Sequence, residues 1–184
     1  MAALVAAALV QFGDRPAWLA AILADRYRRP ALVLFAAACA LALASAAAAI
    51  AGALVASHLA LNARQLLLAA ALGLQGTGAV WPVRPPERLT GWRLGAWLTS
   101  FVGLFILFFG DGLTFIVFAL AARSPVPWLA GVGALLGGMA VLVPAALMGE
   151  AGWLKLPLLA LRRVAGALFG LTAAFLALGA FGLI

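Results

Sequence analysis

Two Gly-Asp pairs lie inside long apolar stretches of this sequence, and their carboxylates are the groups best suited to chemistry. The first pair is Gly13-Asp14, and the second, 97 residues later, is Gly110-Asp111. A charged group at the depth of a membrane is costly, so such residues are rare there and mark functional sites. We therefore expect both aspartates to act on a substrate or an ion.

Two carboxylates in one apolar site can share a proton or bind a cation, and alternation between these states is the chemistry of a cation/proton exchanger. Residues three or four positions apart share a helix face, which adds Gln11 on one side and Ser100 and Thr114 on the other. Such oxygen donors suit Ca²⁺, Mn²⁺ or Mg²⁺. The predicted metal ligands are Asp14, Asp111, Gln11, Thr114 and Ser100.

A structural role for the aspartates is the alternative interpretation. Each carboxylate could be buried against a cationic partner and fix the register of two helices. Arg15 follows Asp14 directly and faces away from it, so such a partner would be an arginine from another helix. We expect Arg15 to tune the aspartates electrostatically rather than to touch an ion.

The composition predicts an all-α integral membrane protein. Hydrophobic residues make up 67% of the chain, charged residues 9%, and the mean hydropathy is +1.19. A soluble domain is about half apolar and about a quarter charged. The single cysteine, Cys39, excludes an internal disulfide. The net charge of +7 comes from short loops, so we expect the lipid bilayer as partner and no nucleic acid.

Hydrophobic patterning predicts six transmembrane helices, and the recurrence of Gly-Asp suggests a repeat. The helices are expected at about 2–24, 30–57, 64–82, 92–122, 127–149 and 164–184. Glu150 to Arg163 is expected to be a semi-polar connection. Three helices in each half make an inverted 3+3 repeat, which is typical of secondary transporters with a site near the membrane midplane. The predicted units are 1–82 and 92–184, joined by a cytoplasmic linker at 83–91.

Loop charges predict the orientation in the membrane. Short cytoplasmic loops are enriched in Lys and Arg. One side carries nine cations, and the other carries only Arg64 and Arg123. Both termini are therefore expected outside. The Ala-rich composition and the lack of a targeting sequence favour a bacterial inner membrane. The nine cations are Arg26, Arg28, Arg29, Arg84, Arg88, Arg93, Lys155, Arg162 and Arg163.

The two Gly-Asp motifs and the 3+3 pattern resemble the GDT family of Mn²⁺/Ca²⁺:H⁺ exchangers. The family signature is E-x-G-D-[KR]-[ST], once in each half, and Gly13-Asp14-Arg15 keeps its central part. Gln11 and Phe108 stand where the family has glutamates. The resemblance implies export of Mn²⁺ first and Ca²⁺ second, in exchange for protons and without a cofactor. It leaves homo-oligomer formation open.

Two other classes of protein remain as alternatives. A transport-inactive or differently specific paralogue, acting as a membrane partner protein, would explain the loss of both glutamates. A membrane aspartyl protease also uses two intramembrane aspartates, but the small size and the inverted repeat argue against it. Ser or Cys nucleophiles with a nearby base are not recognisable in the sequence, so we expect no enzyme activity.

Overall fold

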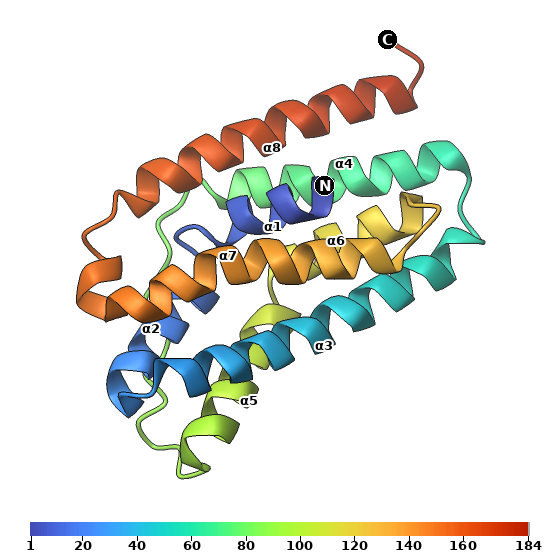
Figure 1. Ribbon diagram of the computed structural model, residues 1–184. Helices are drawn as coiled ribbons and strands as arrows, with labels where there is room; N and C mark the ends of the chain where they lie inside the picture. The colour runs from blue at the N-terminus through green and yellow to red at the C-terminus, as the bar shows by residue number, and fades with distance from the viewer. Residues whose placement is uncertain (184) are drawn as a thin grey trace.

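The computed structural model describes residues 1–183, and all regular elements in this range are α-helices (Figure 1). The all-α prediction is confirmed. In Figure 1, α3, α4, α7 and α8 run alongside one another as the long helices of the bundle. The helices are α1 (Ala2–Gln11), α2 (Arg15–Tyr27), α3 (Pro30–Ala56), α4 (Leu61–Gly78), α5 (Gly95–Phe109), α6 (Gly112–Arg123), α7 (Trp128–Trp153) and α8 (Leu158–Ala180).

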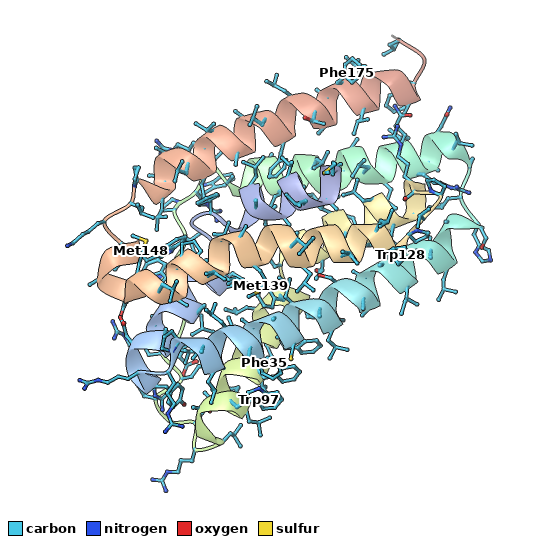
Figure 2. The ribbon with its side chains drawn as sticks, viewed as in Figure 1. Phe35, Trp97, Trp128, Met139, Met148 and Phe175 are labelled. Atoms are coloured by element: carbon cyan, nitrogen blue, oxygen red, sulfur yellow. The ribbon has the colours of Figure 1, made fainter. Side chains whose placement is uncertain are left out.

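Three helices, α3, α7 and α8, are long and apolar enough to cross a membrane, and the bent pair α5–α6 brings the number to four when counted as one span. Large apolar side chains cover the outside of the bundle. Phe35, Trp128 and Phe175 are each more than 60% exposed (Figure 2). Apolar surface of this extent is stable in lipid rather than in water. The chain is a multi-pass membrane protein.

The predicted helices 2–24 and 92–122 are wrong as continuous helices, because each is broken at its Gly-Asp pair. The first break separates α1 from α2, and the second bends α6 by 61° relative to α5. At the first break Gly13 has φ +72°, a conformation that favours glycine. Asp14 and Asp111 then take extended conformations as the N-caps of α2 and α6.

The other predicted bounds agree with the structure to different degrees. Helix α3 ends one residue before the predicted end, and α4 begins and ends earlier than predicted. Helix α7 continues beyond position 149 through a kink at Gly149. The predicted connection up to Arg163 is wrong, because α8 begins at Leu158 and contains Arg162. The predicted end of the last helix, residue 184, lies outside the described residues.

Helices from the two halves of the chain interlock. Helices α1 and α2 pack on α7, α5 and α6 pack on α3, and α4 packs on α8. Small residues allow close approach where lipid gives helices little reason to associate. A Cβ at Gly137 would overlap Leu4 O of α1, and one at Gly166 would lie 2.9 Å from Gly76 O of α4.

The segment between α4 and α5 packs against the end of the bundle that carries Arg26, Arg28 and Arg29 (the Arg-rich end). Arg26 Nη1 donates to Leu89 O at 2.7 Å and to Arg88 O at 3.3 Å. The Leu89 side chain is buried against Gly103 of α5. The N–H of Glu150, just after the α7 kink, donates to Asp25 Oδ2 at 2.7 Å. The Arg26 hydrogen bonds and the buried Leu89 side chain therefore make the α4–α5 segment an ordered part of the fold.

Candidate functional site

The two helix breaks bring Asp14 and Asp111 together. Their carboxyl groups lie within hydrogen-bonding reach of each other when one of them carries a proton. Each aspartate is the N-cap of the helix that follows its break, so the positive ends of α2 and α6 both lie at this pair. The N–H of Arg15 donates to Asp14 Oδ1 at 2.9 Å.

The carboxyl groups of Asp14 and Asp111 lack part of the hydrogen bonding and charge compensation that a buried pair needs. Asp111 Oδ2 is enclosed and finds no hydrogen-bond donor among the described residues. Its neighbour Asp14 offers only acceptor oxygens when ionised, so the two groups repel each other unless something positive lies between them. A shared proton or a bound cation would meet this need. Three or more His, Cys, Asp or Glu side chains do not gather anywhere in residues 1–183.

A cation from α8 also contacts the first aspartate. Arg162 Nη1 lies 3.2 Å from Asp14 Oδ1, and the exposed fractions of the two side chains are 10% and 14%. Arg162 Nη2 donates to Gly78 O at 2.9 Å. The guanidinium near Asp14 is thus that of Arg162. Arg15 itself is exposed, and only its backbone contact to Asp14 is seen in the described chain.

Gln11 is fully buried at the end of α1, and both its Nε2 and its Oε1 lack partners among the described residues. Its Cγ lies near Gly138 of α7, beside the Leu41 side chain. The unpaired amide is costly to bury, about 1–3 kcal/mol for each group left unsatisfied. An enclosed neutral oxygen donor within one turn of Asp14 is compatible with a ligand role.

Thr114 and Ser100 have different relations to the second aspartate. Thr114 Oγ1 donates to Asp111 O at 2.8 Å, and both residues line the same pocket. Ser100 is buried near the other end of α5, where its hydroxyl donates to Ala96 O at 2.7 Å. The nine residues from Ser100 to the end of α5 correspond to about 14 Å of helix. The structure brings Thr114 to the aspartate pair and leaves Ser100 remote from it.

Gln75 of α4 reaches the second break. Its Oε1 lies so close to Gly112 that any side chain there would overlap it. Gly112 is the residue that follows Asp111 and begins α6. Gln75 is not among the ligands predicted from the sequence. Gln75 can occupy this position only because Gly112 has no side chain. Gly112 is therefore the one feature of the sequence that indicates where Gln75 lies.

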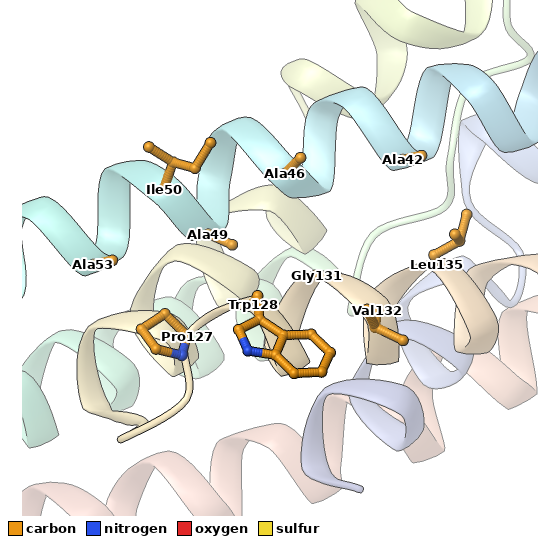
Figure 3. A pocket seen from close by; sticks show the side chains of 10 residues that line it. All are labelled: Ala42, Ala46, Ala49, Ile50, Ala53, Pro127, Trp128, Gly131, Val132 and Leu135. Atoms are coloured by element: carbon orange, nitrogen blue, oxygen red, sulfur yellow. The ribbon is translucent and has the colours of Figure 1, made fainter.

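Separate pockets border the two aspartates. Gly13 and Arg162 line a pocket of about 520 Å³ together with Arg163, and this pocket lies at the Arg-rich end. Asp111 and Thr114 line a pocket of about 360 Å³ against the second half of α3. A third, wholly apolar groove of about 490 Å³ lies between α3 and α7, around Trp128 and Gly131 (Figure 3). This groove contains none of the candidate ligands.

Comparison with known proteins agrees with the motif analysis. The family model described as "Divalent cation/proton antiporter GDT1" matches residues 1–86. A Vibrio cholerae serotype O1 protein described as "Putative manganese exporter" is 30% identical over 172 residues, which cover 90% of this chain and 84% of that protein. No solved structure is significantly similar to the chain.

The family match ends before the second motif, in which the basic residue of the signature is Gly112. The similarity to the Vibrio protein nevertheless extends over most of both chains. The matching region contains Gly13-Asp14-Arg15, the most complete copy of the signature. The chain belongs to the GDT1 family of divalent cation/proton antiporters.

Proposed function

We propose that this chain is a secondary-active antiporter that exports a divalent metal ion in exchange for protons, with Mn²⁺ as the first candidate and Ca²⁺ as the second. The ion and the proton are its cargo. The observation that carries the proposal is the pairing of Asp14 with Asp111 across two broken helices. The name of the Vibrio relative, which includes manganese and export, favours Mn²⁺ and outward transport.

In the proposed site, Asp14 and Asp111 alternate between sharing a proton and holding the ion. Gln11 and Thr114 supply neutral oxygens, and we add Gln75 because it lies against Gly112. The breaks free backbone carbonyl groups, which often complete cation sites in transporters. Ser100 has no part in the site, since its hydroxyl is engaged with Ala96 at a distance. Arg15 acts only through its charge and its backbone N–H.

We also propose that the two halves form an inverted repeat around the site. Both halves contain, in order, a short helix, a Gly-Asp break, a second short helix and two longer helices. Their packing is reciprocal, since α1 packs on α7 as α5 packs on α3, and α2 packs on α7 as α6 packs on α3. The units 1–82 and 92–184 would then rock about the aspartates.

The proposed setting is a bacterial inner membrane with both termini outside and the Arg-rich end in the cytoplasm. In this orientation the pocket beside Gly13 and Arg162 is the cytoplasmic entrance. The pocket beside Asp111 and Thr114 is bordered by the second half of α3, which lies further from that end. Asp14 would therefore be reached from the cytoplasm, and Asp111 from the opposite side of the membrane.

A transport-inactive paralogue is the second candidate. The ion pair between Arg162 and Asp14 favours it, because a cationic side chain already neutralises one of the two carboxylates. Gln11 and Phe108, which stand in place of the family glutamates, point the same way. Under this alternative the aspartates hold the helices together, and no ion drives proton movement.

Proton flux in proteoliposomes separates the two candidates. Liposomes that contain either the full chain or the Asp14→Asn/Asp111→Asn variant are loaded with a pH-sensitive dye. They are then exposed to Mn²⁺, Ca²⁺, Mg²⁺ or Na⁺. The proposal expects flux driven by Mn²⁺ or Ca²⁺ in the wild type and none in the variant. Folded wild-type protein that moves no protons with any of these ions would refute transport. The exposed Glu87→Gln change is the matched control.

A further inference from the structure

Arg162 is a cation buried where the transported ion would have to bind. Its guanidinium contacts Asp14 through one atom pair, Nη1 to Oδ1, at 3.2 Å. The Arg162 Nε atom is also buried and has no partner in the described part of the chain. A bidentate Arg–carboxylate pair is stronger and more rigid than a single contact of this kind. The pair is therefore formed but is open to competition.

The backbone at the first break makes room for this arginine. A Cβ at Gly13 would lie 3.2 Å from Arg162 Cγ and Cδ, and 3.1 Å from Leu158 O at the start of α8. The Gly78 carbonyl at the end of α4 accepts the Nη2 hydrogen bond. The end of α4 thus holds the guanidinium beside Asp14, and Gly13 leaves room for the Arg162 side chain.

Arg162 also borders the pocket at the Arg-rich end, on the side of Asp14. Arg162 and Gly13 line that pocket, whereas Asp14 does not. A cation that enters there meets the guanidinium before it reaches the carboxylate. Arginine keeps its charge at any physiological pH. The ion pair can therefore be broken by displacement of the side chain and not by loss of its proton.

We propose that Arg162 determines specificity: its guanidinium occupies Asp14 in the ion-free protein and leaves only when a divalent cation takes its place. This inference rests on the proposed function. A monovalent ion would replace one positive charge by another and would still have to lose its hydration shell, so it gains little. A divalent ion brings the second charge that two carboxylates need. Arg162 thus excludes Na⁺ and K⁺ and weakens the binding of the divalent ion.

Binding of radioactive Mn²⁺ to the purified full chain in nanodiscs, with and without Na⁺, tests this proposal. We expect Arg162→Gln to bind Mn²⁺ about tenfold more tightly than wild type and to become sensitive to Na⁺. Arg162→Lys should remain insensitive to Na⁺, because it keeps the charge. The exposed Arg93→Gln, outside this pocket, is the matched control and should behave as wild type. Unchanged or weaker Mn²⁺ binding by folded Arg162→Gln, without Na⁺ sensitivity, overturns the proposal.

Two results distinguish this inference from the proposed function. If wild-type binding depends on Asp14 and Asp111 but is unaffected by Arg162→Gln, the antiporter site stands and the role of Arg162 falls. If wild type binds no Mn²⁺, both fall. Should Arg162→Gln fail to fold, chemical modification of wild-type protein replaces it. Mn²⁺ should increase the rate at which phenylglyoxal modifies Arg162, detected by mass spectrometry, and leave the rate at the exposed Arg93 unchanged. An Arg162 rate that does not respond to Mn²⁺ overturns the proposal.

Discussion

Arg162 Nη1 lies 3.2 Å from Asp14 Oδ1, and both side chains are at least 86% buried. Removing either partner leaves a charge buried without compensation, whereas removing both does not. A double-mutant cycle with Asp14→Asn and Arg162→Gln should therefore give a coupling energy of about 1–3 kcal/mol. Thermal or denaturant unfolding in detergent measures it. Additive effects of the two changes would mean that the ion pair contributes nothing to stability.

The two Gly-Asp pairs should respond differently to the same substitution. Gly13→Ala forces a side chain onto a residue with φ +72° and against Leu158 O and Arg162. Gly110→Ala meets only Ile106 O and Leu107 O, at 3.5 Å or more, and Gly110 has φ −91°. We expect Gly13→Ala to cost about 1–3 kcal/mol of unfolding free energy and Gly110→Ala to cost much less. Equal costs at the two positions would contradict the geometry described for the breaks.

The contact between α7 and α1 gives a third prediction. A Cβ at Gly137 would overlap Leu4 O and lie 3.0 Å from Ala7 Cβ. Gly137→Ala should therefore destabilise the protein by about 1–3 kcal/mol, as overpacking does. Gly170→Ala is the control, since nothing lies within 4 Å of a Cβ there. Unfolding in detergent should leave Gly170→Ala close to wild type. A tolerated Gly137→Ala would place α1 further from α7 than the structure has it.

A fourth prediction concerns Gln75. Gly112→Ala would displace the Gln75 Oε1 atom, a flexible side-chain end, without disturbing a backbone. The variant should fold normally, and its Mn²⁺-driven proton flux should fall to the level of Gln75→Ala. Combining Gly112→Ala with Gln75→Ala should lower the flux no further. If Gly112→Ala alone retains full flux, Gln75 contributes no ligand to the ion.

The long helices and the family were predictable from the sequence, because both depend on local patterns. Helices α3, α7 and α8 are long apolar stretches, and Gly13-Asp14-Arg15 is a recognisable motif. The helix breaks were missed because apolar residues surround both motifs on every face, so hydrophobic periodicity does not reveal an interruption. Pro16, near the start of α2, was an overlooked signal.

The position of Arg162 could not be predicted, because it depends on tertiary packing. A cation after Pro157, beside Arg163, has the composition of a loop. In the structure, α8 begins at Leu158, and its first turns lie against Gly13 and Gly78. The alternative that an arginine from another helix pairs with an aspartate is realised here, although the sequence did not identify which arginine. The position of Gln75 could not be predicted either, since only the fold places it beside Gly112.

The most direct test is equilibrium Mn²⁺ binding, which measures the stoichiometry of the wild type and the affinity of each single-aspartate variant. Equilibrium binding to the purified full chain should give one ion per wild-type chain. Asp14→Asn and Asp111→Asn should each weaken binding by about a hundredfold or more, because each removes half of the carboxylate pair. The exposed Glu87→Gln should bind as wild type. Wild-type affinity in either aspartate variant would contradict a single ion shared by Asp14 and Asp111.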